Sequence, residues 1–284
     1  MPARLYLILA LALFSVSTTS LVIRYLAAVP AVVMAFWRMF TASGLLWGYS
    51  ALQPAGRLSN KNRFHIILAG LFLGGHFACF FAGVRLTTIA NATLLGNVAP
   101  VFTALLERLH GRAWNRATVL GLILSLAGAV IIQGGGLTNP ENAAGNGLAL
   151  LSSLFMALAW IQAKTIRKNT HTVVYSRHLF LIAAGTILLV VFLAGYSPFD
   201  FERQHLPWFL FLGLVPSVLG HNLLNYAVRF ISSTAVASVV LGEPILASFF
   251  GLILFQEAMP PASLIGGPMI LIGLYYILSN QSPD

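Results

Sequence analysis

Charged residues are scarce in this chain of 284 residues: they make up 8% of it, and only 7 residues are acidic. Soluble domains carry about 25% charged residues, so this chain cannot cover a water-facing surface. Hydrophobic residues supply 58% of the composition, and the mean hydropathy is +0.86. These values predict an integral membrane protein whose surroundings are the lipid bilayer.

Cysteine and catalytic motifs are also nearly absent. Cys79 is the single cysteine, which excludes an intramolecular disulfide and a cysteine metal site. The sequence has no HExxH motif, no paired membrane aspartates and no GxSxG motif. The stretch "SVLGH" places Ser217 and His221 one helical turn apart, which leaves an intramembrane hydrolase as a remote alternative. We therefore expect no enzyme.

Long apolar runs dominate what remains. A membrane-spanning helix needs about 20 mostly apolar residues. The gaps between the runs are short, so the fold class expected is all-α, a polytopic membrane protein. The first run has signal-peptide features, but the repeat described below needs it as the counterpart of the sixth. We expect ten spans, at roughly 5–24, 30–51, 64–84, 87–107, 116–134, 146–166, 173–195, 206–228, 232–255 and 261–279.

The positive charges lie mainly in the short gaps between these runs. A net charge of +9 would suggest a nucleic-acid partner in a soluble protein, but here the charges are expected to orient the chain, and no nucleic acid is expected. Twelve Lys and Arg residues fall on one side and three on the other, with Arg38 left out because it lies within the second span. By the positive-inside rule both termini are cytoplasmic.

The two halves of the chain resemble each other. "AGVRLTTIANATLLGNVAP" at 82–100 aligns with "YAVRFISSTAVASVVLGEP" at 226–244, with the Val-Arg pair and the proline of each in register. Further on, Gly121 and Gly128 align with Gly266 and Gly273. We expect two five-helix repeats, 1–138 and 139–284. Because five is odd, the repeats cross the membrane in opposite directions, an arrangement common in secondary transporters. Chance matching of apolar runs is the alternative.

These residues carry a family resemblance. The chain resembles the drug/metabolite transporter superfamily of the EamA type, and within it the YddG-like amino-acid exporters of bacterial inner membranes. The best-matched stretch is "GEPILASFFGLILFQE" at 242–257, where Glu243, Pro244 and Glu257 follow the family pattern. The first half departs from it, because Ala99 replaces the glutamate before Pro100.

The resemblance implies a ten-helix exporter in the bacterial inner membrane that moves amino acids or similar small metabolites by alternating access, without cofactor or metal. Exporters of drugs, nucleosides or other metabolites, and a membrane scaffold that does not transport, are the alternatives. The pattern is compatible with proton-coupled and with passive movement, and with any oligomeric state.

Glu243 is the most unusual residue, because it stands in the apolar run "VVLGEPILASFF" with no positive charge within ten residues on either side. A carboxylate at that depth costs about 2.5–3.5 kcal/mol on insertion scales. Pro244 lacks an N–H and is expected to form a hinge, as is Pro100 in the first half. Glu243 is then either a structural carboxylate or a site for a proton or a substrate amino group.

Other polar and aromatic residues at membrane depth are candidates to line the substrate path. Hydrogen bonding between helices is an alternative for the histidines, and a place at the membrane interface is the commoner role for Trp160 and Tyr175. Apart from Glu243, no charge is expected at this depth. A lining of this kind suits aromatic or large neutral amino acids. The candidate substrate-binding residues are His76, Phe80, Asn97, Trp160, Tyr175, His221, Asn225 and Glu243.

Overall fold

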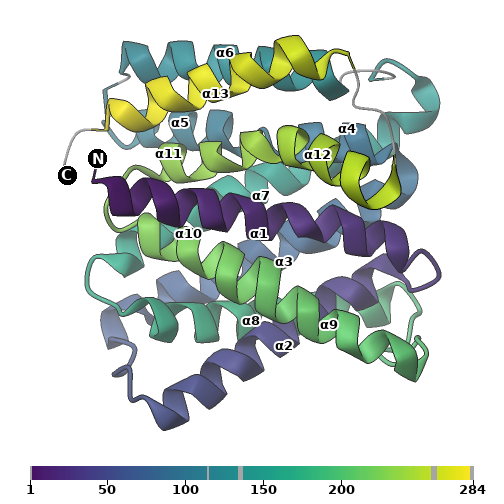
Figure 1. Cartoon of the computed structure of the whole chain (residues 1–284). Helices are drawn as coiled ribbons and strands as arrows, with labels where there is room; N and C mark the ends of the chain where they lie inside the picture. Colours follow the sequence, from purple (N-terminus) through teal and green to yellow (C-terminus); the bar gives the residue numbers. More distant parts are fainter. Residues whose placement is uncertain (1, 114, 134–136, 257–260, 282–284) are drawn as a thin grey trace.

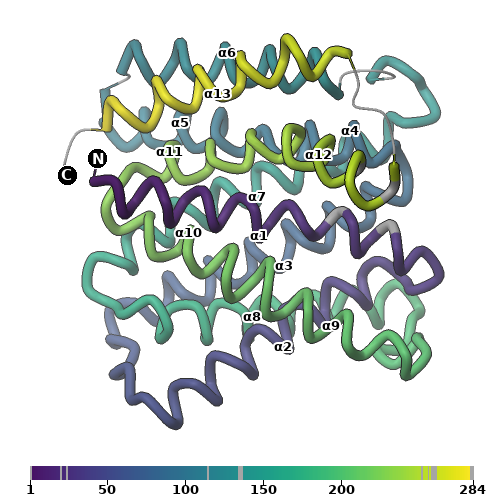
Figure 2. Tube along the Cα trace, viewed as in Figure 1, coloured from purple at the N-terminus to yellow at the C-terminus, as the bar shows by residue number. Residues whose placement is uncertain are grey.

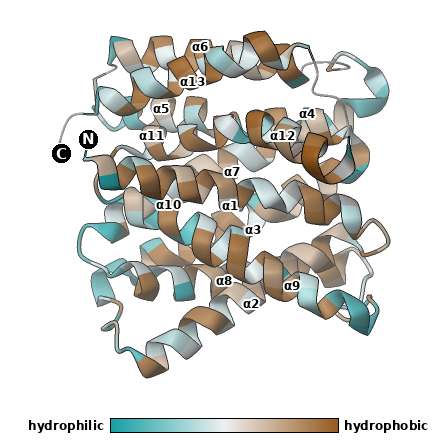
Figure 3. Cartoon of the chain, viewed as in Figure 1, coloured by the Kyte–Doolittle hydropathy of each residue, from teal (hydrophilic) through white to brown (hydrophobic). Residues whose placement is uncertain are grey.

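The computed structural model describes residues 2–113, 115–133, 137–256 and 261–281, without the side chains at positions 20, 24, 251 and 255. Glu257 of the family pattern lies outside these residues. All regular structure in the described ranges is helical, and the helices form one bundle (Figure 1). Hydrophilic residues gather at the two ends of the bundle (Figure 3), as expected when the helices cross a bilayer.

The elements follow one another along the chain with short connections. Three single turns, η1 (Asn60–Asn62), η2 (Pro140–Asn142) and η3 (Arg203–His205), precede longer helices. The helices are α1 (Ala3–Tyr25), α2 (Ala31–Leu52), α3 (Arg63–Leu86), α4 (Ile89–Gly96), α5 (Ala99–Leu109), α6 (Arg116–Gln133), α7 (Ala143–Arg167), α8 (Thr172–Leu193), α9 (Leu206–Leu212), η4 (Gly213–His221), α10 (Asn222–Ala227), α11 (Ser233–Ser238), η5 (Val239–Gly242), α12 (Glu243–Phe255) and α13 (Ser263–Ser279).

Nine helical segments in the described ranges are long and apolar enough to cross a membrane. The last predicted span corresponds to α13, an apolar helix of 17 residues. Three of the predicted spans are not regular α-helices throughout. The fourth is divided into α4 and α5, the eighth contains the π-helical segment η4 with Pro216 inside it, and the ninth contains the 3-10 segment η5. Hydropathy reports length and polarity, but it carries no signal for such breaks.

The bundle is built from pairs of helices that are distant in the sequence. α2 packs on α8, α6 on α13, and α5 on α11, while α3 packs on both α7 and α8. α1 packs along η4 and contacts α10 and α12. Each of the first three pairs joins a helix of the first half to a helix of the second, so the centre of the molecule lies between the halves.

Glycines allow the closest of these contacts. A Cβ on Gly128 of α6 would lie 2.5 Å from the carbonyl oxygen of Gly266 on α13, and Gly121 stands in the same relation to Gly273. The four aligned glycines therefore lie at one interface, where each glycine of α6 contacts the glycine of α13 that aligns with the other one. In "GLFLG" at 70–74 both glycines pack on α8, whereas both glycines of "GLLWG" at 44–48 have open space beside them.

The fourth and ninth spans begin with matching helix caps. The side chain of Thr88 accepts a hydrogen bond from the backbone N–H of Asn91 at the start of α4. Ser232, 144 residues later in the sequence, accepts one from Ala235 at the start of α11. Such caps satisfy backbone donors at helix starts. The local chemistry that starts each short helix is thus the same in both halves.

Candidate functional site

The breaks in the fourth and ninth spans meet at the centre of the bundle. α4 ends at Gly96 and α5 begins at Ala99, so Asn97 lies in the gap. The Asn97 amide donates from Nδ2 to Oε2 of Glu243 at 2.6 Å and to the carbonyl oxygen of Val240 at 3.3 Å. Glu243 is therefore held by a side chain from the other half of the chain.

The two predicted hinge prolines lie directly after these breaks. Pro100 is in the first turn of α5 and Pro244 is in the first turn of α12. Proline is well tolerated in a first turn because its missing N–H would have no partner within the helix. The prolines were expected to kink continuous helices. Instead, each lies in the first turn of a new helix at the centre of the bundle.

Most of the candidate residues line one central cavity of about 60 Å³. A cavity of this size holds several water molecules. Tyr175 and Asn225 line a smaller cavity beside it, which shares Trp160 and His221 with the first. The structure therefore brings all eight predicted residues together. Those in the central cavity are His76, Phe80, Asn97, Trp160, His221 and Glu243.

The two histidines differ in how they are held. His76 Nδ1 lies 2.9 Å from the carbonyl oxygen of Ser152 on α7, and since a carbonyl only accepts, Nδ1 donates and Nε2 is left as an acceptor. The ring of His221 makes no hydrogen bond within the described part of the chain, and it packs edge-on against Phe77 at 5.5 Å between ring centroids. Hydrogen bonding between helices accounts for one ring nitrogen of His76 and for none of His221.

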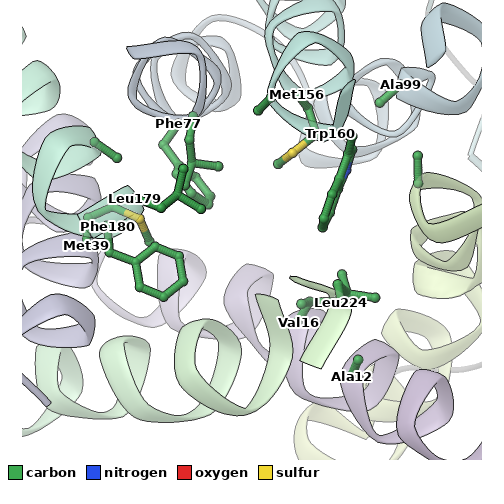
Figure 4. Close-up of a cluster of buried hydrophobic side chains, with 14 of the residues drawn as sticks. Ala12, Val16, Met39, Phe77, Ala99, Met156, Trp160, Leu179, Phe180 and Leu224 are labelled. Carbon is green, nitrogen blue, oxygen red and sulfur yellow. The ribbon is translucent and has the colours of Figure 1, made fainter. Parts of the chain in front are cut away.

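Aromatic rings form the apolar wall of the cavity. Figure 4 shows the indole of Trp160 projecting from α7 into the centre of the bundle, with Leu224 and Val16 below it and Phe77 on the far side. Phe80 stacks on His76 at 6.0 Å between ring centroids. Trp160 is 5% exposed and Tyr175 is 1% exposed. A place in the lipid interface is therefore excluded for both.

Arg38 is the residue that the sequence prediction missed. It lies on α2, is 2% exposed and lines the central cavity. Its guanidinium carbon lies 4.5 Å from the centroid of the Phe77 ring, and its Nε donates to Oγ of Ser217 at 3.0 Å. The expectation that Glu243 is the only charge at this depth was wrong. The signal was present, because an arginine inside an apolar span marks a functional site by default.

Ser217 has a structural role. It accepts the hydrogen bond from Arg38 and donates one to the carbonyl oxygen of Leu212 at 2.9 Å. A serine nucleophile must donate to a general base, and this hydroxyl donates to a backbone carbonyl instead of to His221. The hydrolase alternative therefore has no support in the geometry. Within the described ranges, no three His, Cys, Asp or Glu side chains are grouped so that they could hold a metal.

Comparisons with known proteins agree with this architecture. The EamA-like transporter family matches residues 3–134 and 143–279. An uncharacterized transporter of Archaeoglobus fulgidus is 28% identical over 261 residues, which cover 87% of this chain and 88% of that protein. The pseudopaline exporter CntI of Pseudomonas aeruginosa is 24% identical over 274 residues, with 94% and 93% covered. A crystal structure with 18% sequence identity has the same fold, with a TM-score of 0.82 over 97% of this chain and 96% of that one.

Proposed function

The chain belongs to the EamA-like transporter family and is therefore a membrane transporter and not an enzyme, and we propose that it exports aromatic or large neutral amino acids by alternating access. In this proposal the chain lies in the bacterial inner membrane with both termini cytoplasmic. Ten spans form two inverted repeats, 1–138 and 139–284. The duplicated family match supports this division. Further support comes from Figure 2, where α1 begins at one end of the bundle and the loop before α7 lies at the other.

One observation carries the choice of substrate: Arg38 and Glu243 line the same cavity but form no direct ion pair in the described structure. Each of these buried charges is therefore only partly neutralised, because the opposite charge does not contact it directly. An amino acid carries both complementary charges. We assign its carboxylate to Arg38 and its ammonium group to Glu243.

The rest of the cavity suits an apolar side chain. Phe77, Phe80 and Trp160 present aromatic surface, while His76 and His221 offer ring nitrogens for further hydrogen bonds. Small-molecule sites in proteins combine such apolar walls with a few placed polar groups. A sugar would leave hydroxyls without partners, and an acidic amino acid would bring a second carboxylate beside Glu243.

Alternating access requires a part of the bundle that can change shape. The breaks at Asn97 and at η5 lie beside the cavity and are joined by the Asn97–Glu243 hydrogen bond. Discontinuous helices of this kind form substrate sites in secondary transporters. We propose that the half-helices turn about these breaks, next to Pro100 and Pro244, and open the cavity to one side and then to the other.

Transport by purified protein in liposomes tests the function. Labelled phenylalanine, methionine and glutamate are supplied singly, with and without a pH gradient, and empty liposomes serve as the control. We expect phenylalanine and methionine to move several-fold faster than glutamate. Faster movement of glutamate than of phenylalanine and methionine contradicts the proposal. It would favour the second candidate, export of a different small metabolite, in line with the similarity to the pseudopaline exporter CntI.

A further inference from the structure

A second cleft lies away from the central cavity, at the end of the bundle where α1 begins and α13 ends (Figure 1). It has a volume of about 440 Å³ and is formed by the start of α3, the first half of α8 and the loop between α2 and α3. It shares no lining residue with the central cavity. The transport site therefore does not account for it.

Arginines concentrate positive charge in this cleft. Arg57, Arg63 and Arg177 line it, and none of its lining residues is acidic. The side chains of Arg57 and Arg63 make no hydrogen bond and no ion pair within the described residues. Three cations without a counter-charge indicate a place for an anion, since a phosphate group accepts several hydrogen bonds from guanidinium groups.

Arg177 is held in place at the inner wall of the cleft. Its guanidinium carbon lies 4.1 Å from the centroid of the Trp47 ring, and its Nη2 donates to the carbonyl oxygen of Gly56 at 3.4 Å. The side chain is 9% exposed, and its Nε has no hydrogen-bond partner among the described residues. A buried, pre-positioned donor without a partner is the feature that points to a ligand.

The remainder of the wall is apolar and runs along the helices toward the membrane interior. Ile66 and Ile67 of α3 and Ile182 of α8 line it. Ile182 is ten residues beyond the start of α8, which at 1.5 Å per residue places it about 15 Å along the helix. Ile67 is 48% exposed and faces outward. The cleft thus joins a cationic rim to a hydrocarbon-facing groove.

We infer that this cleft binds one anionic phospholipid, with its phosphate among Arg57, Arg63 and Arg177 and the upper part of an acyl chain along Ile67 and Ile182. Basic pockets between membrane helices are suited to anionic head groups. A free phosphate would use the arginines but would leave the apolar groove empty. The inference is independent of the transported substrate, because it needs only that the chain lies in a bilayer.

Native mass spectrometry of the detergent-purified protein tests the site with phosphatidylglycerol, phosphatidylcholine and glycerol 3-phosphate as probes. The test variant is Arg57→Gln with Arg63→Gln. The matched control removes two charges that do not line the cleft, Arg108→Gln with Arg116→Gln. We expect the unaltered chain to retain one phosphatidylglycerol in preference to phosphatidylcholine. The test variant should bind it about twenty-five-fold more weakly, at a factor of about five for each arginine.

The control variant should retain phosphatidylglycerol as the unaltered chain does, and Arg57→Lys with Arg63→Lys should retain most of it because the charges remain. Equal binding by the test variant overturns the site, and so does an equal loss in the control, which would indicate general attraction to positive charge. Glycerol 3-phosphate that displaces the lipid at equal concentration overturns the lipid assignment in favour of a soluble anion.

Discussion

Asn97 and Glu243 are 146 residues apart in the sequence, and the amide of one donates a 2.6 Å hydrogen bond to the carboxylate of the other. Each lies at a break in a membrane span, one from each half of the chain. This contact explains how a glutamate is accommodated in an apolar run. It also connects the two halves at the cavity, where any change of access must act.

The first prediction concerns this hydrogen bond. Asn97→Ala removes the donor from a buried carboxylate, which should lower the free energy of unfolding by about 1.5–3 kcal/mol. Glu243→Gln keeps an oxygen acceptor at the same place and should keep the melting temperature within a few degrees, while it weakens amino-acid transport. Thermal unfolding in detergent measures the stability of both variants, with the exposed Glu141→Gln as control, and uptake into liposomes measures transport. Unchanged stability of Asn97→Ala would show that the contact contributes nothing.

Arg38 should decide whether the transporter distinguishes a carboxylate from an amide. In the unaltered chain, phenylalanine should compete with labelled substrate better than phenylalaninamide. Arg38→Gln should reduce this preference about ten- to a hundredfold, the equivalent of one charge-assisted hydrogen bond. Competition assays in liposomes measure it, with the exposed Arg203→Gln as control.

The conservative variant of Arg38 tests the role of the charge. Arg38→Lys keeps a positive charge and should keep part of the preference for the carboxylate. If the amide competes as well as the amino acid in the unaltered chain, Arg38 does not hold the carboxylate.

Replacing either histidine should reduce transport, but only the replacement of His76 should also lower the stability of the fold. The ring of His221 has no hydrogen bond within the described structure, so His221→Ala should reduce transport with little change in melting temperature. His76→Ala also leaves the buried carbonyl of Ser152 without its donor, which should cost about 1–3 kcal/mol of stability in addition. Parallel melting and uptake measurements test the difference. Full transport by a variant that lacks both rings would exclude them from the site.

The contact between α6 and α13 should tolerate no added methyl group. Gly128→Ala places a Cβ against the backbone of Gly266, and such overpacking costs about 1–3 kcal/mol. Gly185→Ala on α8 is the matched control, because nothing lies within 4 Å of the added Cβ. Melting temperatures of the two variants should differ by several degrees. Equal melting temperatures would show that α6 and α13 can move apart to admit a methyl group at little cost in stability.

The orientation in the membrane can be read from cysteine accessibility. In a Cys79→Ala background, a cysteine at Asn142 should react with an impermeant thiol reagent from outside intact cells. One at Asn115 should react only after the membrane is opened. The expectation follows from the excess of Lys and Arg on the side of the termini. The reverse pattern would place the termini outside.

Much of this protein can be read from local patterns. Runs of apolar residues predict the helices, because only internally hydrogen-bonded segments are stable in lipid. Polar residues within those runs predict the site, because lipid excludes them and the interior of the bundle receives them. Glu243, Asn97 and both histidines were found in this way. The glycines that aligned between the two halves also lie where the backbones of α6 and α13 meet.

The tertiary structure alone decided which of these residues meet and how each is partnered. It placed Arg38 in the cavity through contacts with Ser217, 179 residues away, and with Phe77. It also buried Trp160 and Tyr175, whose sequence positions were equally typical of the membrane interface. Hydropathy depends on each residue and its neighbours along one helix. Partners, helix breaks and cavities depend on side chains that packing brings together from both halves of the chain.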